Sequence, residues 1–166
     1  MFFRWAGSAN LRAFRSSSDS MCPAICVNER IIAGMDAFET QLPCRGDVIL
    51  FYFGPDNVTY IKRVIAIEGD SVAPGPENSI LVNGKSLELP HVCGDPVRNA
   101  DSYAAPEPFA ATTVPKGTYF VIGDNLNNSY DSRIEGFGLV KREQVRGKAL
   151  FIYWSPGKSR FGCPIR

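Results

Sequence analysis

Short apolar runs of β-branched and aromatic residues, separated by turn residues, constrain the fold of this 166-residue chain most strongly. Asp47–Phe53 and Thr59–Ile67 are two such runs. The turn-forming residues Gly54-Pro55-Asp56-Asn57 join them, so the two runs predict a β-hairpin. Each run has the length of a strand and is too short for a typical helix.

Other runs predict further strands. Asn83-Gly84 separates Ser79–Val82 from Lys85–Leu89 and readily adopts the positive φ angles of a type I′ turn, which predicts a second hairpin. Thr118–Ile122 and Lys148–Trp154 are also rich in strand-forming residues. Because no window has a long helical period, we expect a mainly β chain.

Composition excludes several classes of protein. The 18 Lys and Arg residues against 17 Asp and Glu give a net charge of +1, so no nucleic-acid partner is expected. No stretch reaches the roughly 18 consecutive apolar residues of a membrane-spanning helix, so no transmembrane helix is expected in the sequence as given. Met1–Asn10, broken by Arg4, is too short for a secretory signal.

Cysteine and histidine usage gives no metal-ligand spacing. His91 is the only histidine, and it lies between proline and glycine in a segment typical of a surface loop. No C-x-x-C pair occurs, so neither a metal nor another cofactor is expected. The odd number of cysteines leaves the redox compartment and the disulfide state open. The five cysteines are Cys22, Cys26, Cys44, Cys93 and Cys163.

Three segments could carry chemistry, and each has a structural alternative. Ser16–Pro23 is a cluster of hydroxyl residues that also suits a turn or a helix cap. Lys62 and Arg63 are adjacent in an apolar strand, where alternation sends them to opposite faces, although edge strands also use lysine against aggregation. Gly123–Arg133 is a polar loop with enough donors and acceptors for a buried hydrogen-bond network.

Together the three segments suggest a serine nucleophile with a lysine base. A serine hydroxyl needs a base to remove its proton, and without a usable histidine a neutral lysine amine is the available base. Burial in an apolar strand lowers the pKa of a lysine from about 10.4, which such a role requires. The polar loop would orient the lysine.

The same segments resemble type I signal peptidases, which are membrane-associated serine proteases with a Ser-Lys dyad. The resemblance covers about Ser16 to Ser155 and includes bacterial-type segments after Gly147. The matching boxes are S-x-S-M-x-P at Ser18–Pro23, R-G-D-V at Arg45–Val48, Y-I-K-R-V-I at Tyr60–Ile65, G-D at Gly69-Asp70, V-N-G-K at Val82–Lys85 and G-D-N-x-x-N-S-x-D-S-R at Gly123–Arg133.

The resemblance assigns a role to each matching residue. It makes Ser20 the nucleophile and Lys62 the general base, with Ser129 orienting the lysine amine. The backbone N–H of Ser20 and the hydroxyl of Ser18 would form the oxyanion hole. In the family, an apolar pocket binds the small substrate residue that precedes the cleaved bond. The residues that match this pocket are Met21, Ile25, Tyr60 and Ile61. A structural network is expected from Arg63, Asp124, Asn125, Asp131, Ser132 and Arg133, with Asp131 and Arg133 as an ion pair beside Arg63.

The implied fold has two antiparallel β-sheets and a small inserted flap, with substrate bound as an added strand. Residues 16–166 would be the catalytic domain, and His91–Pro115, which holds four prolines, would be the inserted excursion. Residues 1–15 are either a remnant of, or a substitute for, the family's membrane anchor, or simply a terminal segment. Their aromatic and arginine residues suit an anionic lipid surface.

The implied activity is removal of signal peptides from exported preproteins, at the extracytoplasmic face of the cytoplasmic membrane. Signal peptides and the membrane surface are the expected partners, and the oligomeric state stays open. Within enzymes, a pilin-processing relative or a subunit of the mitochondrial inner-membrane peptidase is the alternative. A LexA-like repressor would need a helix-turn-helix segment before Ser20, for which there is no room. A catalytically silent module that binds signal peptides is an alternative of another class.

Two residues depart from the family pattern. Ala24 follows the box proline, where a small hydroxyl residue is usual. Asp19 stands between the two site serines in place of the commoner Gly or Ser, which adds a carboxylate beside the nucleophile. Neither departure removes a catalytic atom, although Asp19 could alter the pKa of Lys62.

Overall fold

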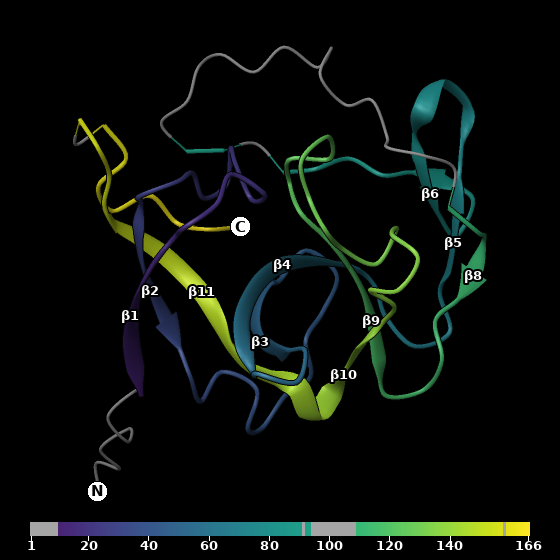
Figure 1. The fold of residues 1–166 in the computed structure, drawn as a ribbon, viewed down its shortest axis with the longest axis horizontal. Helices are drawn as coiled ribbons and strands as arrows, with labels where there is room; N and C mark the ends of the chain where they lie inside the picture. Colours follow the sequence, from purple (N-terminus) through teal and green to yellow (C-terminus); the bar gives the residue numbers. More distant parts are fainter. Residues whose placement is uncertain (1–9, 91, 94–108, 158) are drawn as a thin grey trace, which may run out of the picture.

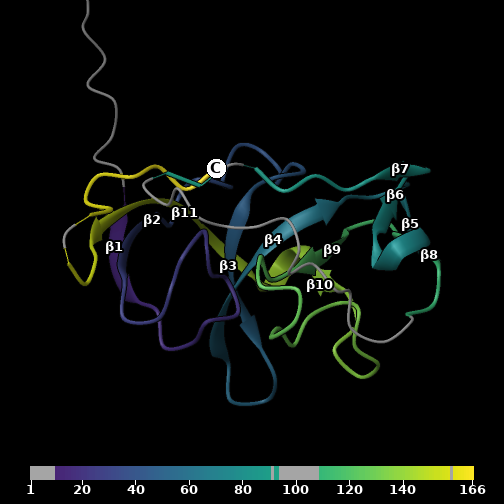
Figure 2. The ribbon, with the colours of Figure 1, turned by 90° about the horizontal axis from the view of Figure 1, so that it is seen from above.

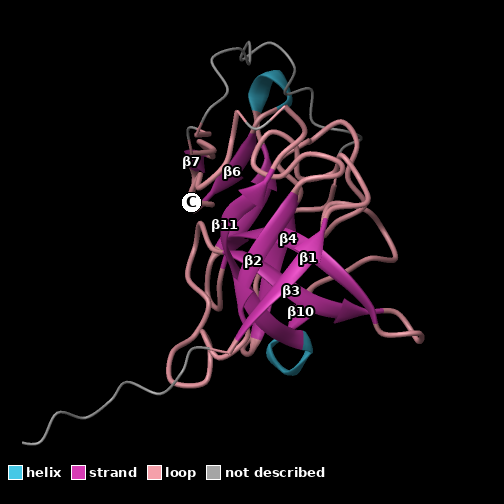
Figure 3. Ribbon diagram, turned by 90° about the vertical axis from the view of Figure 1, so that its left-hand side faces the viewer, coloured by secondary structure: helices cyan, strands magenta, loops and turns pink. Residues whose placement is uncertain are grey.

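The computed structural model describes residues 10–90, 92–93, 109–157 and 159–166, and within them the chain forms two antiparallel sheets. The large sheet has the strand order β1-β2-β11-β3-β4-β9-β10, and the small sheet has the order β7-β6-β5-β8. The predicted mainly β class with two antiparallel sheets is confirmed, and Figure 3 shows helix only as short turns.

The strands are short, as the sequence runs predict. Their bounds are β1 Leu11–Arg15, β2 Arg30–Gly34, β3 Val48–Phe53, β4 Val58–Ala66, β5 Ser71–Pro74, β6 Ile80–Val82, β7 Lys85–Ser86, β8 Thr112–Thr113, β9 Thr118–Ile122, β10 Val140–Lys141 and β11 Val145–Trp154. Two 3₁₀ turns are described, at Pro76–Asn78 and Arg142–Gln144.

Both predicted hairpins are present. β3 and β4 pair from Val48 opposite Arg63 to Phe53 opposite Val58. In the second hairpin, Asn83 and Gly84 both have positive φ, at 51° and 76°, as a type I′ turn requires. The second strand of that hairpin, β7, is shorter than predicted.

Five strands, β1, β2, β5, β8 and β10, were not predicted. β1 and β2 pair along their full length at one side of the large sheet, and β5 is central in the small sheet. β1 includes Leu11–Arg15 of the proposed N-terminal segment, whereas residues 1–9 lie outside the described residues. Of the predicted excursion His91–Pro115, residues 91 and 94–108, including the only histidine, also lie outside them, and β8 joins β5.

β1 and β2 lie at one side of the molecule and the small sheet at the other, with β3, β4 and β9 between them (Figures 1 and 2). One buried cluster packs β2, β3 and β11 under the segment that follows Ser20. A second fills the space between the small sheet and β9, and a third is rich in aromatic rings around β3 and β4. Within the described residues no helix has the length and apolar character to cross a bilayer.

Candidate active site

Pairing of β4 with β9 brings the polar loop to Lys62. The two strands are antiparallel, with Arg63 opposite Ile122. The loop that starts at Gly123 therefore leaves the sheet beside Lys62. This register joins two of the three segments that the sequence singled out.

The segment that carries Ser20 connects β1 to β2 and reaches the same place. Residues 16–29 form turns and bends rather than a strand. Asn125 holds the segment from the polar loop, because its backbone N–H donates to the carbonyl of Ser20 at 3.0 Å and its Nδ2 donates to the carbonyl of Asp19 at 3.2 Å. The carboxylate of Asp19 faces the other way and accepts the backbone N–H of Val27 at 3.3 Å.

Ser20 and Lys62 are in direct contact. Lys62 Nζ lies 2.7 Å from Ser20 Oγ in a hydrogen bond, and the lysine is only 3% exposed. Burial lowers the pKa of Lys62 to about 8, although the negative charge of Asp131 opposes this shift. A lysine with such a pKa holds a useful neutral fraction near neutral pH.

Two buried ion pairs lie next to this contact. Arg133 binds Asp131, as expected, with Nη2 of the arginine 2.8 Å from Oδ2 of the carboxylate. Asp131 Oδ2 also accepts the backbone N–H of Gly123, which fixes the start of the loop. Arg63 was expected beside this pair, but its ion pair is with Asp124, at 2.6 Å.

Ser129 does not make the predicted hydrogen bond. Its Oγ is buried and has no hydrogen-bond partner in this structure, so it does not orient the Lys62 amine here. The hydroxyl lies against Gly123, where an added Cβ would come within 2.3 Å of Ser129 Oγ and 2.2 Å of the Ser20 carbonyl oxygen. Only glycine fits this close approach.

Two other predicted residues, Ser18 and Ser132, lie in different parts of the site. Ser18 Oγ lies 3.2 Å from Ser20 Oγ, on the exposed side of the dyad. Ser132 Oγ accepts the backbone N–H of Val121 at 3.1 Å and thereby ties the polar loop to β9.

A groove of about 480 Å³ runs past the dyad. Met21, Tyr60 and Ile61 line it, as the pocket prediction requires. Ile25 does not, because it is fully buried in the core cluster under the segment. Sequence reasoning missed several lining residues, of which Val58 could have been found from its alternation with Tyr60 and Lys62 along β4. The others are Phe14, Arg15, Ser16, Ser17, Thr59, Asn128 and Tyr130.

A larger cavity of about 650 Å³ lies elsewhere, lined by residues that include Arg45, Lys85 and Lys148. Neither Ser20 nor Lys62 lines this cavity, so the smaller groove, which both residues line, is the candidate substrate site. Within the described part of the chain, no group of three His, Cys, Asp or Glu side chains is placed to hold a metal ion.

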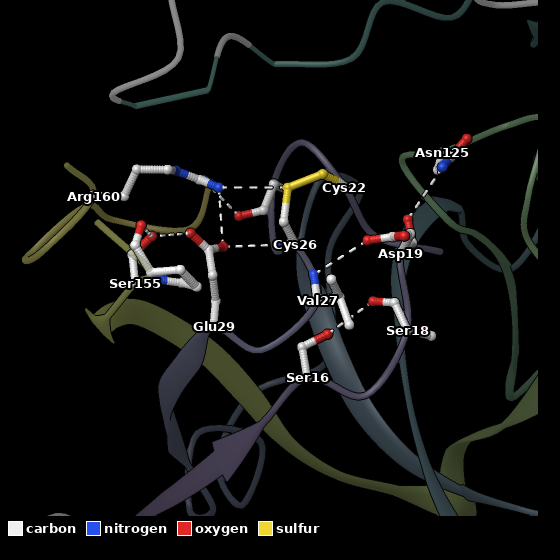
Figure 4. The surroundings of a disulfide bond; sticks show 12 residues. Ser16, Ser18, Asp19, Cys22, Cys26, Val27, Glu29, Asn125, Ser155 and Arg160 are labelled. Carbon is white, nitrogen blue, oxygen red and sulfur yellow. Dashed lines mark hydrogen bonds and ion pairs between the residues drawn. A yellow bond between two sulfur atoms is a disulfide. The ribbon is translucent and has the colours of Figure 1, made fainter. Parts of the chain in front are cut away.

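Sequence reasoning also missed a buried polar cluster behind the Ser20 segment (Figure 4). It contains Glu29, Ser155 and Arg160, and it adjoins the disulfide between Cys22 and Cys26. A second disulfide joins Cys93 to Cys163, and Cys44 is free and exposed.

Comparisons with known proteins point to one family. The profile of a family described as "Signal peptidase, peptidase S26" matches residues 5–154. The chain is 33% identical to signal peptidase I S of Bacillus subtilis (strain 168), over 82% of this chain and 73% of that protein. It is 34% identical to signal peptidase I of Leptolyngbya laminosa, over 82% of this chain and 66% of the relative.

A solved structure is similar as well. The crystal structure of a signal peptidase I from Enterococcus faecalis V583 superposes with a TM-score of 0.52 and is 30% identical in sequence. The match covers 65% of this chain and 97% of the solved one.

Proposed function

The chain belongs to the signal peptidase, peptidase S26, family, and we propose that it is a serine endopeptidase that removes N-terminal signal peptides from exported preproteins. The observation that carries this proposal is the 2.7 Å contact between a buried lysine amine, Lys62 Nζ, and the hydroxyl of Ser20. Such a pair supplies both a nucleophile and its base.

The proposed first step is acylation of Ser20. The neutral amine of Lys62 takes the Ser20 hydroxyl proton while Oγ attacks the carbonyl carbon before the scissile bond. The backbone N–H of Ser20 and the hydroxyl of Ser18 stabilise the negative oxygen of the tetrahedral intermediate. Lys62, now an ammonium, gives its proton to the leaving amine, and the C–N bond breaks.

The second step is hydrolysis of the ester on Ser20. Lys62 is neutral again and takes a proton from a water molecule that attacks the ester carbonyl. Collapse of the second tetrahedral intermediate returns the proton to Ser20 Oγ and releases the carboxyl end of the signal peptide. The same lysine therefore acts in both steps, first as base and then as acid in each.

The groove between the Ser20 segment and the start of β4 suits an extended peptide. Its lining by Met21, Tyr60 and Ile61 supports an apolar pocket for a small residue such as alanine before the cut. Substrate backbone hydrogen bonds would supply affinity and this pocket would supply selectivity.

The signal peptidase I family is membrane-associated. We place the proposed reaction at the extracytoplasmic face of the cytoplasmic membrane, with the membrane surface as a partner. The chemistry supports this location, because a signal peptide has an apolar stretch that partitions into lipid next to its cleavage site.

Cleavage of a peptide with an Ala-x-Ala site tests the proposal. We expect Ser20→Ala and Lys62→Ala each to lower kcat/KM by at least about 1,000-fold, because the dyad acts as a unit. Lys148→Ala is the matched control: Lys148 pairs with Asp47 away from the groove, so its loss should leave cleavage unchanged. Full activity of either dyad variant would refute the mechanism, and binding without cleavage by the unaltered protein would favour the silent module.

A further inference from the structure

Arg160 is a buried arginine that contacts the Ser20 segment from behind. It follows β11 in the chain and is only 7% exposed. Its guanidinium donates to Glu29 Oε2 at 2.9 Å, to the carbonyl of Ala24 at 2.9 Å and to the carbonyl of Cys93 at 3.1 Å. Arg160 thus joins the Ser20 segment to Cys93 and to the part of the chain that follows β11.

Glu29 completes this arrangement with both carboxylate oxygens. Oε2 accepts the backbone N–H of Cys26 at 2.8 Å, and Oε1 accepts the hydroxyl of Ser155, also at 2.8 Å. Glu29 is 2% exposed, so these bonds and the ion pair with Arg160 satisfy a carboxylate that is almost entirely removed from water.

The Ser20 segment is therefore held at two places. Asn125 holds it in front, at Ser20 and Asp19, and the Arg160–Glu29 pair holds it behind, at Ala24 and Cys26. The bond from Val27 N–H to the Asp19 carboxylate joins the two places, which Figure 4 shows at its right and left sides. The intervening turn is closed by the Cys22–Cys26 disulfide.

Stability alone is a weak reason for such a pair. Replacing a buried ion pair by well-packed apolar residues is often neutral or stabilising, whereas an ion pair with several directed bonds fixes one backbone geometry. Catalysis needs that geometry here, because a displacement of about 1 Å between nucleophile and base can cost about 100-fold in rate.

We infer that Arg160, acting through Glu29 and the Ala24 carbonyl, is a positioning residue that keeps Ser20 Oγ within reach of Lys62. The inference rests on the proposed function. Arg160 touches neither Ser20 nor Lys62, so its effect is on the rate of the chemical step rather than on substrate binding.

Steady-state cleavage of the Ala-x-Ala peptide by Arg160→Met tests this role. The methionine fills part of the space but removes every bond to the segment, so we expect kcat to fall at least about tenfold while KM stays within about twofold. Arg160→Lys keeps the charge but cannot make the three directed bonds, so its kcat should lie between those of Arg160→Met and the unaltered protein.

Arg45→Met is the matched control, because Arg45 also forms an ion pair with a carboxylate, Asp70, but does not contact the Ser20 segment. It should keep kcat. The inference is overturned if folded Arg160→Met has an unaltered kcat. If the methionine variant does not fold, an unaltered kcat of folded Arg160→Lys overturns it in the same way. A loss of kcat in Arg45→Met as large as that in the Arg160 variant also overturns it. Failure of the unaltered protein to cleave through Ser20 would instead overturn the proposed function.

Discussion

The proposed role of Lys62 as the base depends on its burial. A solvent-exposed lysine is almost entirely charged at neutral pH and has no lone pair to accept a proton. In β4 the amine is shielded from water, and this desolvation lowers its pKa to about 8. Asp131 and Asp124 oppose this lowering and Arg133 adds to it, and the value of about 8 is the net result of all these effects.

This pKa predicts the pH dependence of cleavage. Only neutral Lys62 accepts the Ser20 proton, so kcat/KM should rise about tenfold per pH unit below the pKa of about 8 and level off above it. A histidine-based serine protease would level off nearer its base's ordinary pKa of about 6.5. The measurement is kcat/KM from about pH 6 to about pH 10, and a steady fall above about pH 7 would contradict the lysine base.

Residue types and alternation predicted part of this site. Adjacent Lys62 and Arg63 were expected on opposite faces of a strand, and in the structure they contact Ser20 and Asp124 respectively. Glu29 and Arg160 could not be found in this way, because they are 131 positions apart and neither belongs to a local motif. Their contact exists only once the fold is formed.

At the scale of elements, the strands that sequence patterns predicted best are those with dense β-branched and aromatic residues, such as β3 and β9. β1 and β2 lack such runs, and only their mutual pairing and the contact of β2 with β11 make them strands. β5 likewise depends on its neighbours β6 and β8.

The two disulfides should act differently. Cys93 and Cys163 are 70 positions apart and restrict the unfolded chain strongly, whereas Cys22 and Cys26 are 4 apart. Chain-entropy arithmetic gives about 4 kcal/mol for the long loop and about 2 kcal/mol for the short one. We therefore expect Cys93→Ala/Cys163→Ala to lower the free energy of unfolding more than Cys22→Ala/Cys26→Ala.

For activity we expect the opposite order, with Cys22→Ala/Cys26→Ala losing more kcat than Cys93→Ala/Cys163→Ala, because the short disulfide closes the turn that follows Ser20. Urea unfolding and kcat of the folded fraction measure the two effects. Equal kcat values for the two double variants would count against a role of this turn in placing Ser20.

In the whole molecule, the strand pairing of the large sheet brings Ser20 and Lys62 together. Ser20 and Lys62 are 42 positions apart, and the polar loop that holds Ser20 enters only through the pairing of β4 with β9. The small sheet is fixed to this unit where Asp70 binds Arg45 and Asn83. These bonds hold the pKa of the Asp70 carboxyl at about 2.

Sequence motifs therefore identified the family, but they did not determine how single side chains pack. Ordered boxes around Ser20, Lys62 and Gly123–Arg133 pointed to the family that the comparisons show. They could not give the positions of Ser129 and Ile25, because whether a hydroxyl finds a partner or an apolar side chain faces a groove depends on packing across the fold.

Reaction with a penem that acylates serine shows whether Lys62 makes Ser20 nucleophilic. The reaction is run near pH 8, which equals the pKa of Lys62, so that about half of the lysine is neutral. Intact mass and peptide mapping detect and locate the adduct. We expect one adduct, on Ser20, in the unaltered protein and none in Lys62→Ala. No adduct under conditions that label a control signal peptidase, or equal labelling of both proteins, would contradict a Ser20 nucleophile that depends on Lys62.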